Sequence, residues 1–132
     1  MGHRSITMNQ MESAVISDEE SRSQPLTISV IMPVYNGAEF IITSLPPLLA
    51  MQQRGEIMEV IVVDDGSTDR SRQIAQDLGA IVISSGGRMG PGGARNQAAA
   101  VAQAELLWFV DADVVVHADA AECLSRGFAD QQ

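Results

Sequence analysis

Residues 26–37 read LTISVIMPVYNG, and this stretch decides the fold. Leu26 to Val34 is β-branched or apolar at nearly every position, which is typical of a parallel strand covered on both faces. The Tyr35-Asn36-Gly37 that follows is a turn signal. The segment therefore predicts a buried strand that ends in a polar turn.

The same alternation of strand and helix continues along the chain. Ala38 to Gln53 has helical spacing, although Pro46-Pro47 must break or restart the helix, so two short helices or one kinked helix are expected. The other predicted strands are Met58–Asp65, Ala80–Ser84 and Glu105–Val110, and the other predicted helices are Thr68–Leu78 (capped by Ser67 or Thr68), Ala94–Ala104 and Asp119–Ala129. This order predicts an α/β fold, a Rossmann-like open parallel sheet with helices on both faces.

The chain divides into a leader and one domain. Residues 1–25 have no apolar core of signal-peptide type, so we expect a disordered leader followed by a single domain over 26–132. The longest apolar run, Leu106–Val110, is far shorter than the roughly 18 to 20 residues of a membrane helix. Cys123 is the only cysteine, which excludes a disulfide framework. These features favour a cytoplasmic protein, with any contact to the inner face of a membrane made by regions outside this chain.

The charge balance excludes one class of partner. Eight Lys and Arg stand against 17 Asp and Glu, which gives a formal net charge of −9. Proteins that hold nucleic acid through its phosphates use clustered Lys and Arg, and this sequence contains no such cluster. We therefore expect no nucleic-acid partner.

Polar residues follow three of the predicted strands. Ligands of open parallel sheets bind beyond the carboxyl ends of the strands, where the strand order reverses. The residues to test are therefore Tyr35, Asn36, Asp64, Asp65, Asp111 and Asp113.

Asp111-Ala112-Asp113 is the sharpest of these features. Magnesium and manganese take oxygen ligands from one or two carboxylates and leave other positions to water and phosphate oxygens. A carboxylate and a phosphate oxygen about 4 Å apart repel by roughly 4 kcal/mol at an effective dielectric near 20, so a diphosphate here would need a cation. The alternative is that both aspartates only end the strand and cap the turn.

Two other segments are ambiguous on their own. Asp64-Asp65 could accept hydrogen bonds from a base or a ribose, but the residues up to Asp69 also form an ordinary turn before a helix. The glycine-rich stretch 86–96 could bind an anion at a helix start, with Arg95 adding positive charge, or could be a mobile surface loop.

The order of the motifs is more specific than any one of them. ISVIMPVYNGAEF, EVIVVDDGSTDRS and GGARNQAAAVAQAELLWFVDAD together resemble the nucleotide-sugar half of family 2 glycosyltransferases, the inverting family with the GT-A fold, from Thr27 to about Asp119. The resemblance implies a UDP- or GDP-sugar as partner and Mn²⁺ or Mg²⁺ as cofactor. Inverting transfer of the sugar to an acceptor hydroxyl is the reaction implied.

The resemblance also implies roles for individual residues. Pro33 and Tyr35 would flank the nucleobase and ribose, and Asp65 would accept from the base. Arg95 would lie near the base or the diphosphate. The last sites implied are those of the family's Asp-x-Asp, in which Asp111 and Asp113 would contact the ribose and the metal.

Only 19 residues follow Asp113, whereas the family's general base and acceptor surface lie well beyond its Asp-x-Asp. We therefore expect a donor-binding half-domain with its general base outside this chain. An exposed edge or apolar face of such a half would favour self-association.

Three alternatives stay open at this point. The first is a catalytically inactive nucleotide-binding or interaction domain. Val62–Asp65 also resembles the start of a response-regulator receiver, but the chain has no lysine for the later strand. Phe109–Val115 resembles the nucleophile strand of haloacid-dehalogenase-type phosphatases, which need a downstream lysine and further acids.

Overall fold

The computed structural model describes residues 4–7 and 26–129. Within this part of the chain five strands form one parallel sheet in the order β1-β5-β2-β3-β4. The strands are β1 (Arg4–Thr7), β2 (Ile28–Val34), β3 (Glu59–Asp64), β4 (Ile81–Ser84) and β5 (Leu106–Phe109), and the helices are α1 (Ala38–Gln53), α2 (Ser71–Leu78), α3 (Gly90–Val101) and α4 (Ala120–Ala129). The predicted α/β fold is confirmed.

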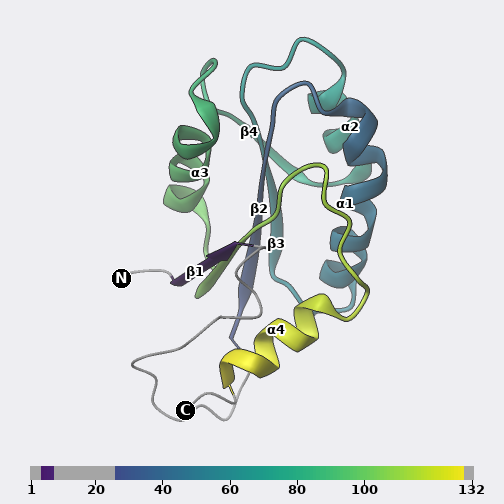
Figure 1. Ribbon diagram of the computed structural model, residues 1–132, viewed down its shortest axis with the longest axis vertical. Coiled ribbons are helices and arrows are strands. Elements are labelled where there is room, and N and C mark those ends of the chain that lie inside the picture. Colours follow the sequence, from purple (N-terminus) through teal and green to yellow (C-terminus); the bar gives the residue numbers. More distant parts are fainter. Residues whose placement is uncertain (1–3, 8–25, 130–132) are drawn as a thin grey trace.

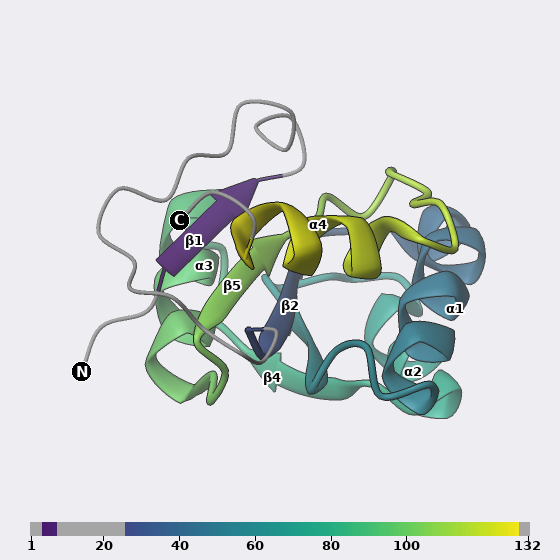
Figure 2. The same ribbon diagram turned by 90° about the horizontal axis from the view of Figure 1, so that it is seen from below.

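Helices cover both faces of the sheet, as Figures 1 and 2 show. The larger core lies between one face of the sheet and helices α1, α2 and α4. On the other face the small side chains of Ala94, Ala98 and Ala102 bring α3 close to Ile31, Ile61, Val63 and Leu107. Trp108 is fully buried in the larger core, and its indole Nε1 has no hydrogen-bond partner among the described residues.

The register of β2 determines where the loops begin. Val34 pairs with Asp64 of β3, and Ile31 pairs with Phe109 of β5. The ladder continues one residue further on each side, since the Asp65 amide donates to the Val34 carbonyl at 2.9 Å and the Val110 amide to the Ile31 carbonyl at 3.0 Å. The loops after β2, β3 and β5 therefore leave from the same edge of the sheet.

Helix α1 differs from the expected pair of short helices, because it runs without interruption through Pro46 and Pro47. A proline inside a helix leaves the carbonyl four residues earlier without its amide donor. Those carbonyls belong to Ile42 and Thr43, which are both exposed, so water can satisfy them. The other face of α1 is stabilised against the sheet by four buried side chains, those of Ile41, Leu45, Leu48 and Met51.

Two other helices begin away from their predicted first residues. Helix α3 starts at Gly90, four residues before the predicted Ala94, so part of the glycine-rich stretch is helical. Helix α2 starts at Ser71, and neither Ser67 nor Thr68 caps it. The Ser71 amide instead donates to Asp69 Oδ1 at 2.9 Å.

The leader prediction is wrong for Arg4–Thr7, which form strand β1 and pair with β5. The outer edge of a strand offers a row of amides and carbonyls that a short β-prone segment can pair with. The other residues of the expected leader lie outside the described residues. No helix within 4–7 and 26–129 is long and apolar enough to cross a membrane.

Candidate functional site

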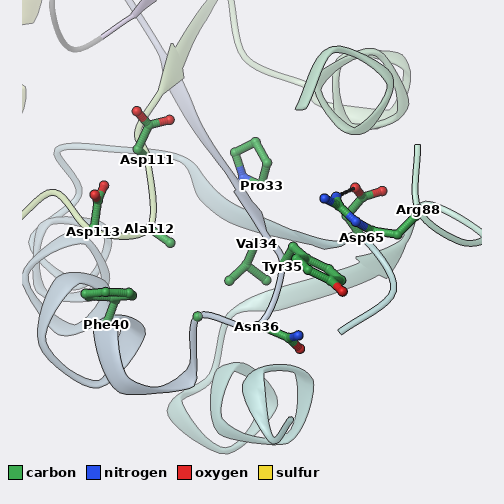
Figure 3. Close-up of a pocket in the computed structure, with 11 residues that line it drawn as sticks. Pro33, Val34, Tyr35, Asn36, Phe40, Asp65, Arg88, Asp111, Ala112 and Asp113 are labelled. Carbon is green, nitrogen blue, oxygen red and sulfur yellow. Dashed lines mark hydrogen bonds and ion pairs between the residues drawn. The ribbon is translucent and has the colours of Figure 1, made fainter. Parts of the chain in front are cut away.

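A pocket of about 240 Å³ opens at the carboxyl ends of β2, β3 and β5 (Figure 3). Tyr35 lies with Asp65 and Arg88 on one side of it, Asp111 and Asp113 lie on the other, and Pro33 lies between them. The lining residues are Pro33, Val34, Tyr35, Asn36, Gly37, Phe40, Asp65, Arg88, Asp111, Ala112 and Asp113. The pocket thus joins an aromatic and basic side to a side with two carboxylates.

Tyr35 and Arg88 form the basic side of the pocket. The Arg88 guanidinium carbon lies 3.7 Å from the centroid of the Tyr35 ring, which is the geometry of a cation–π contact. The same guanidinium donates from Nη1 to Asp65 Oδ2 at 2.7 Å. Arg88 is therefore held by both a flat ring and a buried carboxylate.

Asp65 anchors the glycine-rich segment. Its Oδ1 accepts from Ser85 Oγ at 2.6 Å and from the Met89 amide at 2.8 Å, and its Oδ2 accepts from the Gly90 amide at 2.9 Å in addition to Arg88. Burial alone would raise the pKa of the Asp65 carboxyl, but these hydrogen bonds outweigh it and lower the pKa from 3.8 to about 2. Asp65 is therefore ionised, and both of its oxygens already have donors.

The Asp-x-Asp side of the pocket is open to solvent. Asp111 and Asp113 are both exposed, and the side chain of Asp111 is 70% accessible. Arg95 lies on α3 with its Nη2 at 4.0 Å from Asp111 Oδ1, and its guanidinium carbon is 5.7 Å from the Phe109 ring centroid. Arg95 Nε is buried and has no hydrogen-bond partner among the described residues.

Most of the residues singled out in the sequence come together. Pro33, Tyr35, Asp65, Asp111 and Asp113 all line the pocket, and they come from the end of β2 and from the loops after β2, β3 and β5. Arg95 is near Asp111 but does not line the pocket.

Two polar residues of the lining, Arg88 and Asn36, gained no role from the sequence. Arg88 was only one basic residue in a glycine-rich stretch, and Asn36 was a polar residue after a strand. A basic side chain just before a helix start could have indicated Arg88, because helix starts and cations both attract anions.

The donor set at Asp111 and Asp113 suits a hard cation that keeps other ligands. Among the described residues no three His, Cys, Asp or Glu side chains come together, so the chain offers no closed metal cage there. Two exposed carboxylates beside a pocket match the way Mg²⁺ and Mn²⁺ bind through one or two carboxylates, water and substrate phosphates.

Solved structures of known function share this architecture. Staphylococcus aureus TarS 1–349 matches with a TM-score of 0.65 and 36% identity, over 74% of this chain and 30% of that one. Glucosyl-3-phosphoglycerate synthase from Mycobacterium tuberculosis, solved with Mn²⁺, UDP and glucosyl-3-phosphoglycerate, matches with a TM-score of 0.65 and 29% identity, over 71% of this chain and 36% of that one. The fold is that of the GT-A glycosyltransferases.

The family follows from the sequence comparisons. The model of the family described as "Glycosyl transferase family 2" matches residues 29–130, and the chain belongs to this family. Glycosyltransferase GlyG of Streptococcus pneumoniae serotype 4 is 33% identical over 102 residues, which cover 74% of this chain and 33% of that protein. This chain thus spans about a third of that relative's length. Membership excludes the receiver and the phosphatase as alternatives.

Proposed function

We propose that the pocket binds the nucleoside diphosphate part of a nucleotide-sugar donor, with a divalent cation at Asp111 and Asp113. The observation that carries this proposal is the pocket itself, which places an aromatic and cationic side opposite an Asp-x-Asp. A nucleoside diphosphate suits both sides. Its flat base can stack on the aromatic and cationic side, and its anionic diphosphate can bind the cation that the Asp-x-Asp holds. UDP is our first choice of nucleotide and GDP the second, since the two matched solved enzymes have been determined with UDP or UDP-GlcNAc.

The base belongs at the side of the pocket formed by Pro33, Tyr35 and Arg88. An aromatic face and a guanidinium both stack on a flat base, and Arg88 also presents N–H donors to base carbonyls. Asp65 orients Arg88 through their 2.7 Å ion pair. Asp65 already accepts four hydrogen bonds, so a hydrogen bond from the base to Asp65 would have to replace one of them.

The diphosphate belongs at the opposite side, next to Asp111 and Asp113. These carboxylates would hold Mn²⁺ or Mg²⁺, and such a cation supplies Lewis-acid stabilisation to a departing diphosphate. Arg95 adds a fixed positive charge beside Asp111, with its Nη2 at 4.0 Å. The chain's own contribution is thus to orient the donor and to offset its charge.

The reaction that we assign to the whole protein is inverting transfer of the sugar to an acceptor hydroxyl. That step needs a general base to take the hydroxyl proton. The carboxylates that line the pocket are Asp65, Asp111 and Asp113. Asp65 anchors the glycine-rich segment, and Asp111 and Asp113 would bind the cation. We therefore assign the general base to no described residue.

Titration calorimetry with UDP and GDP tests the donor site, once with MnCl₂ and once with EDTA. We expect binding that requires the metal and that Asp111→Asn or Asp113→Asn weakens at least about tenfold, or about 1.4 kcal/mol. Asp77→Asn makes the same chemical change on exposed α2, outside the pocket, and should bind like wild type.

Two results would count against this assignment. Unchanged affinity in both aspartate variants would reject the metal site. A folded wild-type chain that binds neither nucleotide would favour the alternative of an inactive interaction domain.

A further inference from the structure

Asn36 joins the loop after β2 to the loop after β3. Its Oδ1 accepts from the Thr68 amide at 2.7 Å, from the Asp69 amide at 3.2 Å and from Thr68 Oγ1 at 3.3 Å. Its own amide donates to Ser67 Oγ at 2.9 Å. A single exposed asparagine therefore makes contacts with three consecutive residues that lie more than 30 positions away in the sequence.

The backbone of Asn36 shows why the residue is an asparagine. Its φ is +51°, and it is the only non-glycine residue with a positive φ among the described residues. Glycine adopts this left-handed conformation without steric cost, and asparagine tolerates it better than most other residues. Glycine could supply the backbone geometry of this position, so the additional contribution of Asn36 is its side-chain amide.

The start of α1 depends on the same pair of loops. Gly37 at the N-cap has no side chain to satisfy the first amides of the helix. The Gly37 amide donates to Ser71 Oγ at 2.9 Å and the Ala38 amide to Asp69 Oδ2 at 3.1 Å, so the loop after β3 caps α1. Desolvation would raise the pKa of the Asp69 carboxyl, but hydrogen bonds from Ser71 and from the Ala38 amide outweigh it and lower the pKa.

These bonds form an interlock between residues 36–38 and 67–71. Tyr35 directly precedes the first segment, and Asp65 lies two residues before the second. Both residues belong to the aromatic and basic side of the pocket (Figure 3). Asp111 and Asp113 follow β5, and neither takes part in the interlock.

We propose that Asn36 is a positioning residue that sets the Tyr35 ring relative to Asp65 and Arg88, and thereby the affinity for the nucleoside. This inference rests on the donor site proposed above. Asn36 acts through the loop that it holds and not on the reacting atoms. Its loss should therefore weaken nucleotide binding and leave the affinity of Asp111 and Asp113 for the metal alone unchanged.

Asn36→Gly is the decisive variant, because it keeps the left-handed backbone and removes only the amide. Calorimetry should give a Kd for UDP with saturating Mn²⁺ that rises about tenfold. The Kd of Mn²⁺ alone, measured by electron paramagnetic resonance, should match wild type. Amide hydrogen exchange at Thr68 and Asp69 should become faster, since these amides lose their acceptor.

Two further variants separate positioning from a loss of stability. Asn36→Asp keeps an oxygen acceptor for both amides, so it should restore slow amide exchange at Thr68 and Asp69. Thr43→Gly destabilises α1 at an exposed position outside the interlock, so it should lower the thermal midpoint and leave the Kd for UDP unchanged.

The outcomes distinguish this inference from the donor site itself. If wild type binds UDP and Asn36→Gly binds it equally well, the positioning role is overturned and the donor site stands. Parallel loss of UDP and Mn²⁺ affinity in Asn36→Gly would also overturn it, because that result indicates general damage. If wild type binds no UDP, the proposed function fails and the inference fails with it.

Discussion

The Asp65 carboxylate is both ionised and buried, and four hydrogen bonds stabilise it in that state. Its four donors come from Ser85, Arg88 and the amides of Met89 and Gly90, so one carboxylate fixes the entire turn before α3. Replacement by a neutral amide would place an N–H₂ group against one of these donors. A buried donor that loses its acceptor costs about 1–3 kcal/mol.

Asp65→Asn should therefore lower the free energy of unfolding, and the loss should depend on pH. The folded pKa, about 2, lies below the ordinary 3.8, so the carboxylate stabilises the fold fully above about pH 4 to 5, and this contribution disappears as the pH falls toward 2. Urea unfolding at pH 7, 4 and 3 should show the gap between wild type and variant becoming smaller. A gap of constant size would contradict this account, and Asp77→Asn should show no such gap.

Arg88 is the cation of a pocket that otherwise holds three aspartates. Arg88→Ala removes that charge and the contact with Tyr35, so UDP affinity in the presence of Mn²⁺ should fall about five- to tenfold by calorimetry. Arg88→Lys keeps the charge without the planar stacking group, so its affinity for UDP should lie between those of wild type and Arg88→Ala. Arg72→Ala, at an exposed position of α2 outside the pocket, is the matched control and should bind UDP like wild type. Tighter binding of UDP by Arg88→Ala than by wild type would contradict this role and show that Arg88 obstructs the base.

At the scale of elements, the buried strands were the most predictable. Runs such as Ile61-Val62-Val63 have both faces covered, so burial and sequence pattern carry the same information. Helix ends were less predictable because they depend on distant partners. Asp65 accepts from the amides of Met89 and Gly90 at the start of α3, and Asp69 accepts from the Ala38 amide at the start of α1. Neither contact follows from local sequence.

Helix α1 shows a different limit of the sequence. Two adjacent prolines argue against a continuous helix, yet tertiary burial of one face outweighs their local preference.

The position of the pocket was predictable from the sequence, and the contacts inside it were not. Parallel strands deliver their carboxyl ends to one edge, whereas the bonding of Arg88 and Asn36 depends on how loops pack there.

Strand β1 protects the outer edge of β5. A variant that begins at Gln24 lacks β1 and leaves the amides and carbonyls of that edge without partners from β1. We expect it to self-associate, with a mass in multi-angle light scattering that rises with concentration more steeply than for the full chain. Equal masses at all concentrations would show that this edge is not adhesive.

For the whole molecule, overall charge and local charge act together. The chain carries a net charge of −9, and three of its aspartates line the pocket that an anionic donor would enter. Long-range repulsion of an anion is screened by salt, whereas repulsion inside the pocket is screened less. The cation that we propose at Asp111 and Asp113, together with Arg88 and Arg95, would offset that repulsion where it is strongest.

The burial of Trp108 also has an optical consequence. Trp108 is the only tryptophan and is 0% exposed, whereas Tyr35 is the only tyrosine and is 44% exposed in the pocket. An indole in apolar surroundings emits at shorter wavelength than one in water, so the fluorescence of Trp108 follows unfolding. Tyr35 instead lies where the proposed ligand would bind, away from the buried indole. The chain thus carries in Trp108 an intrinsic probe of its own folding that lies outside the proposed binding site.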